Sequence, residues 1–219
     1  MINYLRKKFN RNDDLYTTYE LESVKDITIN YKEEKLSSFI FLDELKKLPN
    51  LESLTLNDGF IFNININLFN TLPKLKEITF ERCNFEDESY LNNLKVISLN
   101  LINNRIDNYN FIEHMQNKIK LSLINISIRT SILYDIAKNL LILDISYSKI
   151  IRNESLNLSN INTLYIDNSN IIDLEFTKYM KNLKVLRVDN KQYNKNEDII
   201  KNLKKKNVTI LDENNKEYV

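Results

Sequence analysis

The stretch "LKEITFERCNF", which runs from Leu75 to Phe85, decides how this chain folds. Its apolar residues are Leu75, Ile78, Phe80 and Phe85, and the only cysteine of the chain, Cys83, lies between the last two. Neither the two-residue period of a strand nor the 3.6-residue period of a helix gives this spacing throughout. A short strand through Ile78 and Phe80 that turns away at Cys83 does give it. The stretch therefore indicates a strand followed directly by a turn.

The same spacing recurs at regular intervals along the chain. If Leu75 is position 1, apolar residues hold positions 1, 4, 6 and 11, and position 9 belongs to the turn. Copies of this frame begin at residues 51, 75, 96, 118, 140, 161 and 183, and the copy at 118 is looser because it starts with lysine. Consecutive starts lie 21 to 24 residues apart. Such a period indicates a repeat protein in which each unit packs on its neighbours.

This pattern resembles the leucine-rich repeat motif, L-x-x-L-x-L-x-x-N/C-x-L. The short period is most similar to the bacterial and phosphatase-regulator subclasses of that family. The resemblance implies an α/β fold, a right-handed leucine-rich repeat solenoid shaped as a horseshoe or arc. Its concave side would be a parallel sheet, and its convex side would carry short helices or irregular turns.

The repeats are expected to lie between two atypical ends. Residues 1–50 form an N-terminal flank with a degenerate capping repeat, residues 51–204 form the leucine-rich repeats, and residues 205–219 form a C-terminal cap and tail. Ile27 and Ile29 repeat the strand pattern near the start, and Val208 and Ile210 repeat it near the end. End repeats of a solenoid deviate because they must present a polar outer face.

Side chains at positions 4 and 6 are expected to enter the core, because alternate residues of a strand point to opposite faces. Leu143 and Ile166 are such residues, whereas Asp144 and Tyr165 beside them are expected to face solvent. In the returning segments, residues 37–49 show helical spacing that ends at a proline. Further short helices are expected on the convex side at residues 110–118, 132–140, 175–182 and 197–205.

Position 9 carries Asn or Cys in the family, where the side chain satisfies backbone groups of the turn. Only Cys83 and Asn104 match that pattern here. The departures predict an interrupted hydrogen-bond ladder, with local irregularity near Ile126 and Lys191. The departing residues are Gly59, Ile126, Ser148, Ser169 and Lys191.

No catalytic, metal or cofactor site is predicted. Cys83 holds a position that the repeat itself assigns to Cys, and the lone histidine, His114, is expected on the opposite, convex side. One Cys and one His cannot supply a zinc set, and a single glycine cannot build a phosphate-binding loop. We therefore expect a protein that is not an enzyme and needs no cofactor.

Charge and hydropathy restrict the partners. A net charge of +1 gives no reason to expect nucleic acid or an anionic membrane, and the basic run Lys201–Asn207 is expected to be a charged terminal cap. No signal peptide is visible, and no run approaches the roughly 18 apolar residues of a membrane span. We expect a cytoplasmic monomer from an AT-rich genome, with export by a non-classical route left open.

The frame also predicts which residues face a partner. In this family the strand face commonly binds the partner. The resemblance therefore implies a binding surface on that face. Isoleucines replace polar residues on the central repeats beside two tyrosines, and aspartates flank an arginine as a mixed-charge edge. The candidate residues are Ile102, Ile124, Ile142, Asp144, Tyr147, Tyr165, Asp167, Arg187 and Asp189.

The predicted function is a non-catalytic protein–protein interaction module that binds its partner on the concave strand face. One alternative is a substrate-recognition or regulatory subunit of an enzyme system, such as a phosphatase regulator or a ubiquitin-ligase receptor. Another is a pathogen protein that acts on a host protein. The sequence leaves these readings open, because one fold hosts many functions.

Overall fold

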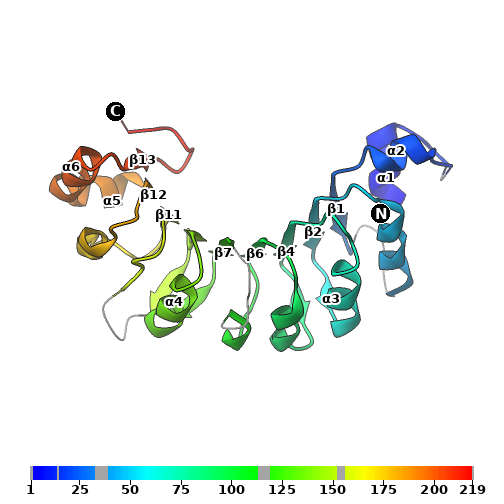
Figure 1. Cartoon of the computed structure of the whole chain (residues 1–219), viewed down its shortest axis with the longest axis horizontal. Helices are drawn as coiled ribbons and strands as arrows, with labels where there is room; N and C mark the ends of the chain where they lie inside the picture. The colour runs from blue at the N-terminus through cyan, green and yellow to red at the C-terminus, as the bar shows by residue number, and fades with distance from the viewer. Residues whose placement is uncertain (1, 14, 33–38, 113–118, 152–155, 219) are drawn as a thin grey trace. The chain divides into compact units, whose positions relative to one another are not determined.

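A computed structural model describes the chain except for residues 1, 14, 33–38, 113–118, 152–155 and 219. It divides into two compact units, Met1–Asn117 (unit 1) and Lys118–Val219 (unit 2), and each is described by itself. Figure 1 colours both units along the chain. Among the described residues, no helix is both long enough and apolar enough to cross a membrane.

The sheet of unit 1 is parallel, and each of its strands is separated from the next by a returning segment. The strands follow the order β1 (Asp26–Asn30), β2 (Ser53–Asn57), β4 (Glu77–Glu81) and β6 (Ser98–Ile102). Helices α1 (Ile2–Phe9) and α2 (Thr18–Glu22) precede β1. The returning segments contain η1 (Phe39–Lys47), β3 (Phe60–Ile61), α3 (Asn63–Phe69), β5 (Asn84–Phe85), η2 (Glu88–Asn93) and η3 (Asn110–Ile112).

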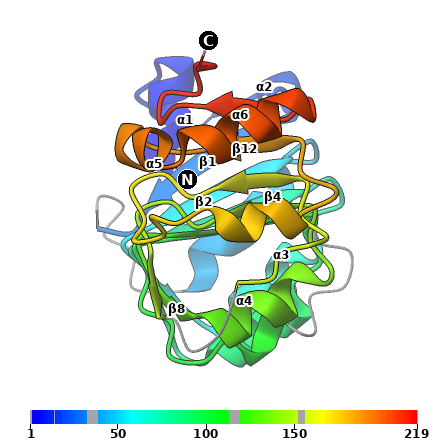
Figure 2. The ribbon, with the colours of Figure 1, turned by 90° about the vertical axis from the view of Figure 1, so that its left-hand side faces the viewer.

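Unit 2 repeats the same plan. Its parallel sheet contains β7 (Lys120–Ile124), β9 (Ile142–Asp144), β11 (Thr163–Tyr165), β12 (Val185–Arg187) and β13 (Thr209–Leu211), in that order. The returning segments contain β8 (Ser127–Arg129), α4 (Thr130–Ala137), β10 (Lys149–Ile151), η4 (Glu175–Tyr179), α5 (Asn190–Lys195) and α6 (Glu197–Lys205). Figure 2 shows α5 and α6 side by side next to β12.

The strand register confirms the repeat frame. Position 4 of one repeat lies opposite position 4 of the next, as Leu54 does with Ile78 and Leu143 with Leu164. The degenerate ends obey the same rule, since Ile27 pairs with Leu54 and Ile210 pairs with Leu186. Side chains at positions 4 and 6 are buried in both units, among them Leu143 and Ile166, which are fully inaccessible.

In six repeats the turn after the strand reverses at position 8, where the backbone adopts the left-handed conformation. The residues there are Asp58, Arg82, Asn103, Asn125, Tyr147 and Asn168, with φ between 50° and 59°. Asn and Asp tolerate this conformation, whereas a bulky side chain is strained in it. Four of the six positions carry Asn or Asp, and Arg82 and Tyr147 are the exceptions.

Position 9 forms a ladder that is more complete than the sequence predicts. Asn104 accepts a hydrogen bond from the Cys83 amide at 2.7 Å and donates to the Phe80 carbonyl at 2.8 Å. Ser148 does the same for the Ile126 amide (3.1 Å) and the Leu123 carbonyl (2.6 Å), so serine replaces asparagine. Ile126 itself has an apolar side chain and supplies no such hydrogen bonds, so the predicted interruption of the ladder stands at that position, although the Ile126 amide is satisfied by Ser148.

At the last repeat, the ladder residue is displaced by one position. Gln192, and not Lys191, donates to the carbonyls of Ile166 and Ile171 at 2.9 and 2.8 Å. The chain enters α5 at this point, because Asp189 caps the helix and forms a capping box with Gln192. The irregularity expected near Lys191 is thus a helix that starts directly after the strand.

The returning segments agree with the predicted helices only in part. Helix α6 has the predicted bounds, and α4 begins two residues and ends three residues earlier than predicted. The segments at 37–49 and 175–182 contain the 3-10 helices η1 and η4 instead of α-helices. Residues 113–118 lie outside the described residues.

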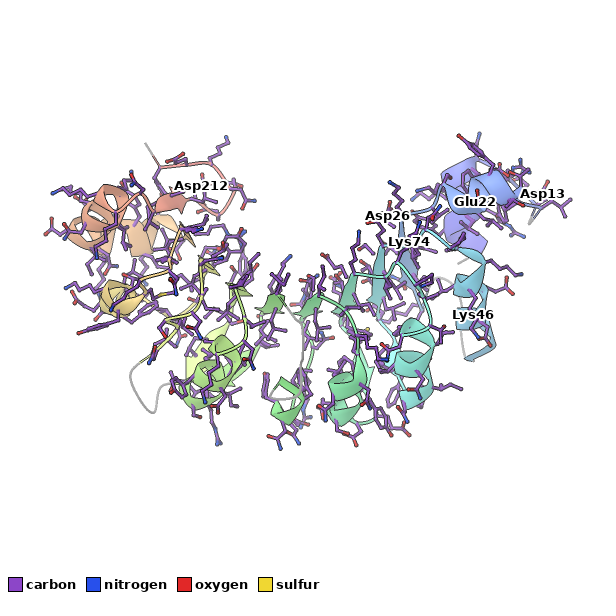
Figure 3. All side chains as sticks on the ribbon, in the orientation of Figure 1. Asp13, Glu22, Asp26, Lys46, Lys74 and Asp212 are labelled. Carbon is purple, nitrogen blue, oxygen red and sulfur yellow. The ribbon has the colours of Figure 1, made fainter. Side chains whose placement is uncertain are left out.

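Both terminal strands are joined to the ends of the chain. The Tyr4 hydroxyl of α1 donates to the carbonyl of Asp26 at 2.8 Å, and Figure 3 labels Asp26 at the start of β1. After β13 the chain turns at Asp212 and returns, so that the Tyr218 amide donates to the Ile210 carbonyl. Covering the backbone edge of β13 in this way protects it from pairing with other chains.

The only glycine of the chain marks a close approach of two segments. A Cβ atom added at Gly59 would lie 2.5 Å from Cδ2 and 2.9 Å from Cγ of the Tyr31 ring. The φ angle of Gly59 is not positive, so the backbone itself accepts alanine. The tyrosine ring alone therefore excludes a side chain here.

We predict that Gly59→Ala lowers the free energy of unfolding by about 1–3 kcal/mol, the usual cost of overpacking. Urea denaturation of both variants measures it, and Tyr31→Leu supplies the matched background. On that background the alanine should cost little, because the clashing ring is gone. An equal loss on both backgrounds would show that the ring is not the cause.

Candidate functional site

The predicted site residues of unit 2 lie at the ends of its strands and in the turns that follow. Asp144, Tyr165 and Arg187 are the last residues of β9, β11 and β12, and the register places them directly beside one another. Ile124 ends β7, and Ile142 begins β9. Tyr147, Asp167 and Asp189 follow in the turns. Ile102 ends β6 of unit 1, where it is partly exposed.

Arg187 is the centre of a buried polar cluster. Its Nε donates to Asp167 Oδ1 at 2.6 Å, and its Nη2 donates to Ser146 Oγ at 3.0 Å and to Asp144 Oδ2 at 3.4 Å. The guanidinium carbon lies 4.1 Å from the centre of the Tyr165 ring, a cation–π contact. The side chain of Arg187 is only 14% exposed, so water screens these contacts weakly.

The cluster is closed by two further groups. Ser146 Oγ donates to Asp167 Oδ1 at 2.8 Å, and Asn215 Oδ1 of the returning C-terminal segment accepts from Arg187 Nη1 at 3.1 Å. Each strand end and the tail thereby contribute one group to a single network. Such a network holds the strand ends and the tail in one arrangement.

Two aspartates expected to face a partner are buried instead. Asp144 is 6% and Asp167 is 1% exposed, because both carboxylates turn toward Arg187 rather than toward solvent. Asp189 caps α5, and its second oxygen accepts from the Asn168 amide at 2.8 Å. The mixed-charge edge is therefore satisfied within the chain.

Tyr147, in contrast to these aspartates, is exposed to solvent. It is 55% exposed, and it adopts φ 59° at a position where the neighbouring repeats carry Asn125 and Asn168. Ile124 and Ile142 are partly exposed on the same strand face. Strained backbone of this kind persists where the surrounding structure imposes it, and it is concentrated at functional sites. The strain at Tyr147 singles it out among the candidate residues.

Some of these features could be predicted from the sequence and others could not. The run of Asn and Asp at position 8 signals a left-handed turn, and reading that column would have marked Tyr147 as the exception. Nothing in the repeat pattern signals that Asn215, beyond the last repeat, reaches Arg187. Asn215 is too far from Arg187 along the chain for the sequence pattern to indicate this contact.

Cys83 is a structural residue in this fold. Its thiol is buried and donates to the Leu56 carbonyl at 3.2 Å, and burial raises the pKa of the thiol to about 11. A thiolate is therefore rare at neutral pH. His114 lies outside the described residues. Among the residues that are described, no group of acidic, Cys or His side chains is arranged to hold a metal ion.

We predict that Cys83 of the native protein resists alkylation by iodoacetamide at pH 7.5, because the reagent needs an accessible thiolate. Mass spectrometry of the intact protein measures the modification. The same protein in urea should be alkylated readily, which provides the control. Rapid alkylation of the folded protein would contradict the buried position.

We also predict the energetic role of Arg187. Arg187→Met should lower the free energy of unfolding by about 3–5 kcal/mol, because it leaves two buried carboxylates without their counter-ion. Lys201→Met removes one partner of an exposed ion pair with Glu197 and should cost less than about 1 kcal/mol.

Guanidinium denaturation of these variants, and of Arg187→Met combined with Asp144→Asn and Asp167→Asn, tests the cause. The triple variant should recover part of the loss, because amides tolerate burial better than unpaired carboxylates. If Arg187→Met costs no more than Lys201→Met, the cluster does not stabilise the unit.

Comparison with solved structures finds an internalin C2 from Listeria monocytogenes with a TM-score of 0.57 and 20% sequence identity, over 86% of this chain and 82% of that one. The chain has the leucine-rich repeat fold. An internalin (inlF) from the same organism matches with a TM-score of 0.42 and 20% identity, over 96% of this chain and 87% of that one. No protein-family model and no curated protein sequence matches the chain.

At 20% identity the likeness to internalin C2 shows the fold alone. This leucine-rich repeat fold agrees with the parallel strands and the repeat register of both units. The similarity to the phosphatase-regulator subclass stays a prediction. So does the division into a flank, repeats and a cap at residues 50 and 204.

Proposed function

We propose that the strand face of unit 2 is a non-catalytic surface that binds a protein partner through Tyr147, Ile124 and Ile142. The observation that carries the proposal is the exposed tyrosine at a left-handed position. A tyrosine there costs stability that Asn or Asp would not cost, and it leaves a large amphipathic ring in solvent. Recognition by a partner is a physical reason for keeping it.

The surroundings of Tyr147 suit protein recognition. Aromatic residues bordered by aliphatic ones are typical of the energetic centre of protein interfaces. The Tyr147 amide donates to the Asp167 carbonyl at 3.0 Å, so the turn is tied to the Arg187 cluster. A surface held in place before binding loses little conformational entropy when the partner arrives.

The Arg187 cluster supports this role by holding the strand ends in place. Asp144, Tyr165, Asp167 and Arg187 bind one another and fix the strand ends on which the surface is built. We therefore assign these four residues to positioning, and not to direct contact. Ile102 of unit 1 stays a candidate on its own.

Two narrower roles remain alternatives within this proposal. As a regulatory or substrate-recognition subunit, the chain would hold a protein of an enzyme system, such as a phosphatase or a ubiquitin ligase. As a pathogen protein, it would hold a host protein. The identity of the captured partner distinguishes these roles. The monomeric state and the cytoplasmic location stay predictions.

The test is the variant Tyr147→Asn, which restores the residue type of the neighbouring repeats. We predict that it raises the free energy of unfolding by about 0.5–1 kcal/mol, because Asn relieves the backbone strain. We also predict that it weakens partner binding by about tenfold or more, as loss of an aromatic anchor does. Gain of stability with loss of binding is the signature of a residue kept for recognition.

Affinity capture from cell extracts, followed by a titration with the purified partner, measures the binding. The matched control is Tyr179→Asn, which changes a tyrosine that is 76% exposed on η4. This control should leave the affinity unchanged. A partner held equally by the wild type and by Tyr147→Asn would refute the proposed surface.

A further inference from the structure

A second surface of unit 2 lies at the opposite ends of its strands. A groove of about 740 Å³ follows the amino ends of β9, β11, β12 and β13, where Leu141, Asn162, Lys184 and Thr209 are among its lining residues. Ile142 of the proposed strand-face surface directly follows Leu141 of the groove, but Tyr147 lies beyond the carboxyl end of β9, and no residue of that surface lines the groove. The two surfaces therefore make independent predictions.

A smaller cavity adjoins the groove at the end of α6. It has a volume of about 500 Å³ and is lined by Lys178, Ile199, Asn202, Leu203, Lys205 and Lys206. Lys206 lines both hollows, which makes them neighbours. Ile199 and Leu203 give the cavity an apolar wall, and Leu141, which is 45% exposed, does the same for part of the groove.

The charge on this surface has one sign. Lys181, Lys184, Lys205 and Lys206 are exposed lining residues, and among the described residues none of the four forms an ion pair with a carboxylate. No Asp or Glu lines either hollow. The chain as a whole carries a net charge of only +1, so the lysines here form a local positive patch.

The helix dipole explains only part of this patch. Lys205 lies in the last turn of α6, and Lys206 follows it, where a cation is favourable. Lys181 and Lys184 lie outside any helix, next to the strand ends. Position 2 of the repeat is Leu141 and Asn162 in the two preceding repeats and becomes Lys184 in the last. The repeat frame does not require a lysine there.

We propose that the groove and the adjoining cavity bind an acidic peptide segment of a protein partner, one that carries a large apolar side chain. Its carboxylates would lie against Lys181, Lys184, Lys205 and Lys206, and its apolar side chain would enter the cavity beside Ile199 and Leu203. Opposite charge fixes the orientation, and burial of the apolar side chain supplies affinity.

The lining favours a peptide over nucleic acid. Single-stranded nucleic acid is usually held by aromatic side chains on which bases stack, together with arginines. The lining residues of both hollows include neither an aromatic residue nor an arginine. An apolar wall inside a cavity instead suits one bulky side chain of a protein.

The test uses a labelled synthetic peptide of roughly twelve residues, about 40 Å when extended, made of Asp and Glu around one central Phe. Fluorescence anisotropy with the full chain measures its binding. The variant Lys181→Glu/Lys184→Glu/Lys206→Glu should weaken binding about tenfold or more, and added salt should weaken it in the wild type. A peptide with Ser in place of Phe should also bind more weakly.

The matched control is Lys149→Glu/Lys191→Glu/Lys216→Glu, which changes the net charge equally at exposed lysines that line neither hollow. It should retain most of the affinity. If the groove variant melts at a lower temperature than the control, Lys181→Gln/Lys184→Gln/Lys206→Gln replaces it and should still weaken binding.

Equal weakening by both triple variants would overturn the proposal, because net charge alone would then explain binding. Absence of peptide binding would overturn it as well. Tighter binding of a deoxythymidine oligonucleotide, or of vesicles with anionic lipids, would assign the patch to nucleic acid or to a membrane surface instead. None of these outcomes bears on Tyr147, so the two proposals fail separately.

Discussion

The fold depends on how each turn satisfies its buried backbone groups. After the strand of most repeats the chain reverses at position 8, which carries an amide and a carbonyl into the interior. In several turns a side chain from the following repeat binds them, as Ser148 does for Ile126 and Leu123 and as Asn104 does for Cys83 and Phe80. In these turns a repeat completes the one before it. Stability in such a stack is a sum over neighbouring repeats.

This construction leaves the strand face available for other uses. Because the inward side chains form the core, the outward residues of the strands are less restricted by packing than the inward ones. In unit 2 those residues divide into two kinds. The Arg187 cluster is buried and fixes the strand ends, whereas Tyr147 is exposed at a strained position. The charged groove at the other ends of the strands is a further surface with a different chemistry.

The sequence predicts the repeat frame well, because burial at positions 4 and 6 follows directly from strand periodicity. Leu143 and Ile166 are inward, and α6 has the expected bounds. The burial of Asp144 could not be predicted in the same way. Its position faces away from the core, but Arg187, two repeats later, draws it into a buried ion pair. Contacts across repeats depend on which side chains meet, and periodicity does not contain that information.

The candidate site was predicted as a region and not residue by residue. The expected frame reached the strand ends and turns that carry Arg187 and Tyr147, but it placed all nine residues, the apolar ones and the mixed-charge ones alike, in contact with a partner. The structure separates positioning residues from exposed ones through burial and φ, which the sequence does not state. Gln192 is another feature that the repeat pattern did not predict. The capping box between Asp189 and Gln192 starts a helix here, so the side chain that binds the preceding turn comes from position 10 and not from position 9.

Native-state hydrogen exchange of Ser148→Ala tests the central claim, that a position-9 side chain of one repeat holds the turn of the repeat before it. We predict that the Ile126 amide, which donates to Ser148, exchanges about tenfold faster or more once its acceptor is gone. The Ile150 amide, which donates to Asn170 at 2.7 Å, should change far less. An Ile126 amide that keeps its protection, or a rise shared equally by Ile150, would contradict the account.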